Sequence, residues 1–66
     1  MSNQSILDEI AHLHGVSSRL EGIADDYPTA TTELLIISGN VLGMATMLGM
    51  LITAKLEGNK GNPASN

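Results

Sequence analysis

The sequence predicts an all-α fold: an antiparallel helical hairpin that pairs with a second copy into a homodimeric four-helix bundle. Residues 5–24 repeat apolar side chains at helical spacing, residues 25–29 form an acidic turn with a proline, and residues 29–57 form a second helical segment around a long uncharged run. Tyr27 is the only aromatic residue and cysteine is absent. The core must therefore be built from Leu, Ile, Val, Met and Ala, a composition typical of helices packed on helices.

The first expected helix, residues 5–24, is amphipathic. Ser5 precedes its first turn, where the hydroxyl can cap a free amide, and Asp8 adds negative charge there. Leu7 falls outside the apolar arc, so we expect it to be exposed or to meet a partner chain. Ser17 falls inside the arc and is expected to bond to a carbonyl of its own helix. At about 100 degrees per residue, the arc contains Ile6, Ile10, Leu13, Val16, Leu20, Ile23 and Ala24.

The segment 25–29 interrupts this pattern. Pro28 has no amide hydrogen to continue a helix, and it disfavours helical geometry at Tyr27. Asp26 or Thr29 is expected to cap the helix that follows. Because a connection of about 3 to 5 residues joins antiparallel helices, the two helical segments should form a hairpin.

The second expected helix, residues 29–57, has more apolar surface than one neighbouring helix can cover. Two adjacent rows of side chains span roughly 200 degrees of its surface, and the second row runs from Leu35 to Leu56. Gly58 is the expected stop signal, and residues 58–66 are expected to form a disordered tail. The predicted dimer core combines the first row with part of the first helix: Leu34, Ile37, Val41, Met44, Leu48 and Leu51, with Ile10, Leu13 and Leu20.

A membrane span is the alternative for the same segment. Residues 34–54 carry no charged side chain, and about 20 such residues match a hydrocarbon core roughly 30 Å thick. Gly39 and Gly43 are spaced as in small-residue helix packing motifs, so this alternative is a holin-like single-span protein. Against it, aromatic belts are missing, Asn40 would lie within the hydrocarbon, and residues 5–24 are patterned to cover a neighbouring helix in water.

Size and charge restrict the classes of function. The 66 residues suffice for one domain, which at this size needs an additional stabilising element. Because cysteine and therefore disulfides are absent, self-association is the simplest such element that remains. Seven acidic residues against three scattered basic ones provide no phosphate-binding surface, so no nucleic-acid partner is expected. The first residues lack the pattern of a secretory signal, which makes the cytoplasm the expected location.

No pattern of catalytic, cofactor-binding or metal-binding residues is present, so an enzyme is not expected. His12 and His14 point about 160 degrees apart on one helix and cannot hold one metal ion together, although metal binding or a pH switch between subunits remains the alternative. Asp25 and Asp26 are interpreted as caps and solvated charges rather than an acid–base pair. Ser17 and Ser18 near His14 lack the acid and oxyanion hole of a triad.

The predicted function is therefore binding: a small acidic protein that dimerises and binds, inhibits or regulates another protein. Met side chains either fill gaps in a core or adapt to irregular partners, and Tyr27 either anchors a partner or packs the turn onto the end of the bundle. In size and architecture the layout resembles the primer-repressor class of paired helical hairpins and the small acidic inhibitors carried by bacteriophages or mobile elements. The basic RNA-contacting face of a primer repressor is absent here, and no site residue carries over. The candidate partner-binding residues are Leu7, Asp25, Asp26, Tyr27, Met47 and Met50.

Overall fold

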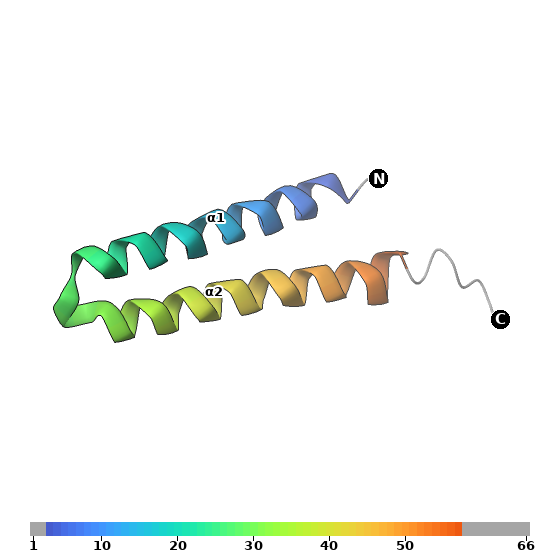
Figure 1. Ribbon diagram of the computed structural model, residues 1–66. Helices are drawn as coiled ribbons and strands as arrows, with labels where there is room; N and C mark the ends of the chain where they lie inside the picture. Colours follow the sequence, from blue (N-terminus) through green and yellow to red (C-terminus); the bar gives the residue numbers. More distant parts are fainter. Residues whose placement is uncertain (1–2, 58–66) are drawn as a thin grey trace.

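The computed structural model describes residues 3–57, which form two long helices packed side by side in opposite directions (Figure 1). Helix α1 spans Gln4–Asp26, the 3-10 helix η1 spans Pro28–Ala30, and α2 spans Thr31–Leu51. The π-helix η2, Ile52–Glu57, continues α2. The predicted all-α hairpin of two packed helices is confirmed. Gly58 and the expected tail, residues 58–66, lie outside the described residues.

Helix α1 begins one residue before the predicted start and ends two residues later. Ser5 lies inside the first turn, and no side chain caps this helix; instead the Asn3 carbonyl accepts hydrogen bonds from the amides of Ile6 and Leu7, at 3.1 and 3.0 Å. The predicted Ser5 cap is therefore wrong. The helix continues to Asp26 because the constraint that Pro28 imposes falls on the residue immediately before it, Tyr27.

The turn is closed by a threonine that the sequence did not single out. The Thr31 hydroxyl donates to the carbonyls of Ala24, at 2.7 Å, and Tyr27, at 3.2 Å. The carbonyls in the last turn of a helix have no partner within that helix, and Thr31 satisfies one of them from the start of α2. No side chain caps η1 or α2, so the caps predicted at Asp26 and Thr29 are wrong.

The two helices meet along a narrow seam. Small side chains occupy its most buried places: Ser17 and Ala24 on α1, and Ser38 and Ala45 on α2, each at most 4% exposed. In each helix the covered residues follow one another at alternating spacings of three and four, the repeat of a coiled-coil seam. The buried and half-buried residues of this seam are Ile6, Ile10, Leu13, Ser17, Leu20 and Ala24 on α1, and Thr31, Leu34, Ser38, Val41, Ala45, Leu48 and Ile52 on α2 and η2.

Hydrogen bonds between the two helices fix the register of the seam. Ser17 bonds to Ser38, and Ala24, seven residues further along α1, bonds to Thr31, seven residues back along α2. In the same register, Ile10, seven residues before Ser17 on α1, lies opposite Ala45, seven residues after Ser38 on α2. Small residues at these heptad positions allow the two backbones to approach closely, so the seam is thin.

The seam uses only part of the predicted dimer core. Leu34, Val41 and Leu48 are half-buried in it, as are Ile10, Leu13 and Leu20 of α1. The other three members of the row on α2, Ile37, Met44 and Leu51, are exposed. The covering helix therefore lies between the two predicted rows rather than over either one.

Candidate interaction surface

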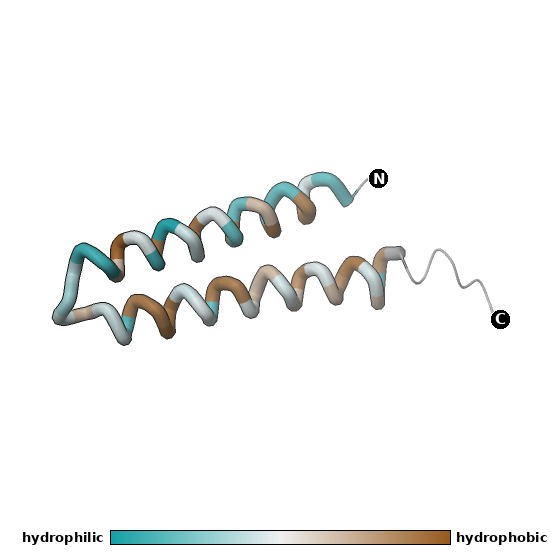
Figure 2. Tube along the Cα trace, in the orientation of Figure 1, coloured by the Kyte–Doolittle hydropathy of each residue, from teal (hydrophilic) through white to brown (hydrophobic). Residues whose placement is uncertain are grey.

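Apolar residues occur along the whole of helix α2 with few strongly polar ones between them, whereas α1 alternates between apolar and polar residues (Figure 2). Such a helix is normally buried all round, either in a large core or in a membrane. Here α1 covers one side only. Nine large apolar side chains of α2 and η2 are exposed: Leu35, Ile36, Ile37, Leu42, Met44, Met47, Met50, Leu51 and Leu56.

An open apolar groove runs along one flat side of the hairpin. It has a volume of about 500 Å³ and is lined by one residue of α1, Leu13, and four of α2. Its floor is the half-buried pair Leu13 and Leu48, and its rim is formed by exposed side chains. The residues that α2 contributes are Met44, Met47, Leu48 and Leu51.

One row of exposed side chains borders this groove and has charges at both ends. Ile37, Met44 and Leu51 are seven residues apart and are 48%, 60% and 43% exposed. Glu33, in the first turn of α2, lies on the same face, and Lys55 follows beyond its other end in the π-helix η2; each is eleven residues from Met44. We call these five residues the central row. Its signal in the sequence is the equal spacing of two opposite charges about Met44, in addition to the periodicity of the apolar members.

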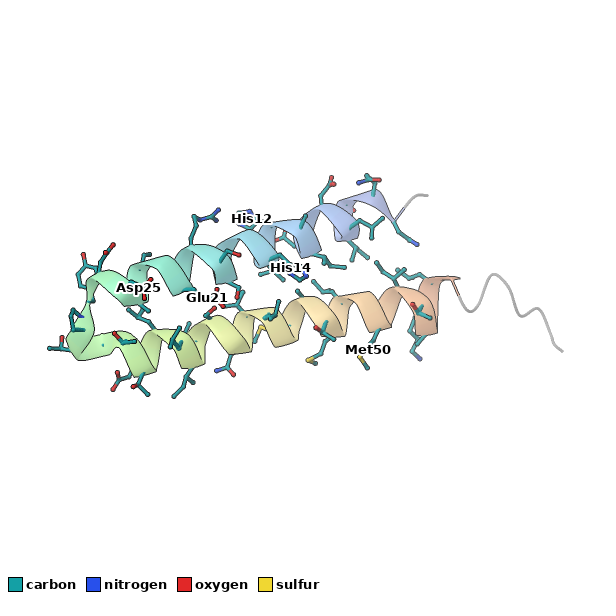
Figure 3. The ribbon with its side chains drawn as sticks, in the orientation of Figure 1. His12, His14, Glu21, Asp25 and Met50 are labelled. Atoms are coloured by element: carbon teal, nitrogen blue, oxygen red, sulfur yellow. The ribbon has the colours of Figure 1, made fainter. Side chains whose placement is uncertain are left out.

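A second exposed strip lies on the edge of α2 away from the seam. Ile36, Met47 and Met50 form this outer edge, and Figure 3 shows Met50 pointing away from α1. Gly39 and Gly43 lie among them, and a Cβ atom placed on either would meet nothing within 4 Å. The close helix packing expected at these glycines is therefore not made by α1.

The polar side chains of α2 outside the seam differ in how they are satisfied. The hydroxyls of Thr46 and Thr53 donate to carbonyls of the preceding turn, those of Leu42 and Gly49, at 3.2 and 3.4 Å. Asn40 is exposed, and within residues 3–57 its side chain has no hydrogen-bond partner. An amide in this state is suited to water or to a polar partner and is costly in hydrocarbon.

The two buried serines form the only hydrogen bond between side chains that crosses the described part of the seam. Their hydroxyl oxygens lie 2.7 Å apart; the Ser38 hydroxyl also lies 2.8 Å from the Ser17 carbonyl, and the Ser17 hydroxyl 3.1 Å from the Ser38 carbonyl. The expectation that Ser17 bonds within its own helix is wrong, because a neighbouring hydroxyl is close enough to compete. The sequence contains a signal for this bond: a serine lies at a position of the apolar repeat in each helix, Ser17 in the first and Ser38 in the second.

The remaining candidate residues do not form one site. Tyr27 is 58% exposed beside the exposed Asp25 and Asp26 at the turn, and Leu7 is exposed near the opposite end of α1. Figure 3 shows Asp25 at the turn and His12 and His14 in the other half of α1. Both histidines are exposed, and residues 3–57 contain no group of three side chains able to hold a metal ion.

The second helical segment also meets the length and composition of a membrane span. Residues Pro28–Leu56 form 29 continuous residues of this kind, and 17% of their most apolar stretch is buried in the hairpin. Length and composition alone are weak evidence, because the core helix of a water-soluble protein passes the same test. A core helix, however, is mostly buried, and in the single hairpin this one is not.

Comparison with known proteins assigns this chain to no family. No protein-family model matches the sequence, and no curated protein or solved structure matches the chain.

Proposed function

We propose that the protein is a non-enzymatic interaction module of the cytoplasm, a homodimer of hairpins in a four-helix bundle that binds another protein and regulates it by covering part of its surface. The observation that carries this proposal is the contrast in burial on α2. Nine large apolar side chains of α2 and η2 are exposed, while the buried apolar residues of the described chain are Ala24, Ala45 and Ile52.

Pairing of two hairpins would bury many of the large apolar side chains that a single hairpin leaves exposed. Covering one Leu, Ile or Met side chain contributes about 1.5–3 kcal/mol, so a shared interface over several of them adds several kcal/mol to what the seam provides. A hairpin of this size has too little interior to be comfortably stable alone. The polar outer side of α1, with His12 and Arg19 exposed, indicates that the assembly faces water.

The outer edge of α2 is the part of the surface that we assign to the partner protein. Met47 and Met50 have flexible side chains that fit irregular apolar surfaces, and Ile36 extends the strip toward the turn. The exposed carboxylates of Asp25 and Asp26 favour a partner with a basic rim. The mechanism is occlusion: the partner's own helix or subunit contact packs on this edge and is no longer accessible.

The experiment compares two tagged variants for dimerisation and for capture of a partner from the native host. Met50→Glu places a charge on the outer edge and should leave the dimer intact while it lowers capture at least tenfold. Ser18→Glu places the same charge on an exposed position of α1 and is the matched control. Equal capture by both variants would contradict the assignment of the outer edge, and a monomeric parent protein would contradict the proposal as a whole.

A membrane protein is the second candidate, favoured by the absence of charged side chains from residues 34–54 and by the low burial of this segment in the hairpin. The hydroxyls of Thr46 and Thr53 already bond within the helix, as hydroxyls in a bilayer must. The exposed amide of Asn40 and the polar side of α1 oppose this function. Cell fractionation distinguishes the membrane protein from the interaction module. Recovery in the membrane pellet, with release only by detergent, would support the membrane protein and contradict the first proposal.

A further inference from the structure

We infer that the second copy docks antiparallel along the central row, with the two-fold axis passing Met44 and with Glu33 of each chain opposite Lys55 of the partner subunit. This inference rests on the proposed homodimer and specifies its interface. It follows from three properties of the row: its charges, its shape and its angle to the seam.

The charges of the row are self-complementary only in an antiparallel pair. Glu33 and Lys55 lie eleven residues before and after Met44, so a two-fold axis through Met44 brings each carboxylate opposite an ammonium group. The same axis places Ile37 opposite the partner subunit's Leu51. A parallel pair would instead place Glu33 opposite Glu33 of the partner subunit. Antiparallel α2 helices also oppose their macrodipoles favourably.

The row and the groove are complementary in shape in the same register. The groove lies beside Met44, Leu48 and Leu51, in the second half of α2, and Ile37 projects from the first half. The two-fold axis carries Ile37 of the partner subunit to the position of Leu51, at the rim of the groove. Each chain thus supplies both the projecting side chain and the recess that accepts it.

The row has the angle to the seam that a four-helix bundle requires. At 3.6 residues per turn, Glu33, Ile37 and Leu51 fall within about 30 degrees of Met44 on the surface of α2, and the centre of the seam lies about a quarter turn away. Lys55 follows in the π-helix η2, whose wider turns place it at the edge of the row. In a bundle of four helices on a square, the two neighbours of each helix are a quarter turn apart. With α1 on the seam and the partner subunit's α2 on the row, both neighbour positions of α2 are filled.

Single cysteine variants test the register directly, because the natural chain contains no cysteine. Met44→Cys lies on the axis and should form a disulfide-linked dimer rapidly and nearly completely under mild oxidation. Ile37→Cys alone should remain uncrosslinked, since fourteen residues along the helix separate it from its copy by about 21 Å, far beyond disulfide reach. Ile37→Cys mixed with Leu51→Cys should crosslink, and Met50→Cys on the outer edge is the control that should not.

Each outcome has one meaning, provided that the mass of each variant in detergent-free buffer is measured beside the crosslinking. A dimer in which Ile37→Cys links to itself, or Met44→Cys does not, overturns the antiparallel register and leaves the proposed dimer standing. A monomer overturns both. Recovery only with detergent assigns the row to lipid rather than to a second copy, and again overturns both.

Charge reversal provides a test that does not depend on oxidation. Glu33→Lys and Lys55→Glu should each weaken dimerisation about tenfold at low salt, because two symmetric ion pairs become repulsive. The double variant restores both pairs with reversed signs and should dimerise like the parent. If the single reversals dimerise as tightly as the parent, the charges do not face each other and the inferred interface is wrong.

Discussion

The hydroxyl oxygens of Ser17 and Ser38 lie 2.7 Å apart at the middle of the seam between α1 and α2. Each hydroxyl carries one hydrogen, so with Ser38 donating to the Ser17 carbonyl, Ser17 donates to the Ser38 hydroxyl, the nearer of its two acceptors. A slip of the helices by one heptad would bring Ser17 opposite Ala45 or Thr31 and break this arrangement. The pair therefore specifies the register of the hairpin, as isolated polar residues do in coiled coils.

Alanine substitutions at the two serines should be strongly non-additive. Ser17→Ala or Ser38→Ala removes one hydroxyl but leaves the other a carbonyl acceptor, so each should lower the free energy of unfolding by about 1 kcal/mol. The double variant should lose clearly less than the sum, because the bond between the hydroxyls is lost only once. Urea unfolding followed by circular dichroism, at one protein concentration, measures all three. Strictly additive losses would show that the two hydroxyls do not interact.

Removal of the Thr31 hydroxyl should loosen the turn. Thr31→Val keeps the shape of the side chain but leaves the carbonyls of Ala24 and Tyr27 without this donor, which should cost about 1 kcal/mol. Thr31→Ser retains the hydroxyl and is the control. Amide hydrogen exchange should become faster in residues 24–31 of the valine variant and stay near the parent rate in the serine variant. Equal rates in both would contradict the role of Thr31.

Enlarging a small residue of the seam should force the helices apart. Ala45 is 1% exposed opposite Ile10, so Ala45→Leu should destabilise the hairpin by about 1–3 kcal/mol. Ala11→Leu adds the same atoms at an exposed position of α1 and should change stability by less than about 0.5 kcal/mol. Thermal and urea unfolding compare the two. A tolerated leucine at position 45 would mean that the seam is wider than the buried small residues indicate.

Loss of the Tyr27 ring should affect binding rather than assembly. The side chain is 58% exposed at the turn and is not part of the central row, so Tyr27→Ala should retain the mass of the parent assembly. If the ring anchors the partner protein, affinity for a captured partner should fall about tenfold or more, as at other aromatic hot spots. Calorimetry with that partner measures the change. Unchanged affinity would remove Tyr27 from the binding surface and leave it as a residue of the turn.

The helical hairpin was predictable from the sequence because its signals are local. The spacing of apolar residues in α1, the proline at position 28 and the uncharged run of α2 each act within a few residues. The caps were not predictable to the residue, because several hydroxyls and carboxylates compete near each helix end. Thr31 is used because the hairpin brings it under the end of α1, and no local pattern expresses that approach.

The large extent of the candidate surface was predictable from the sequence, but the side of α2 that α1 covers was not. The apolar rows of α2 indicated more surface than one helix covers, and the exposed Ile37, Met44 and Leu51 agree with that. Which side α1 takes depends on the fit of small residues across the seam, above all Ser17 against Ser38. That fit joins residues far apart in the chain, so periodicity within one helix does not determine it.

Sedimentation equilibrium of the purified chain in detergent-free buffer tests the pairing of hairpins most directly. If a second copy covers the exposed side of α2, the mass should be twice the 6.9 kDa of one chain and should fall toward one chain only on dilution. A chain that remains soluble at 6.9 kDa over the whole concentration range, or that stays in solution only with detergent, would contradict it.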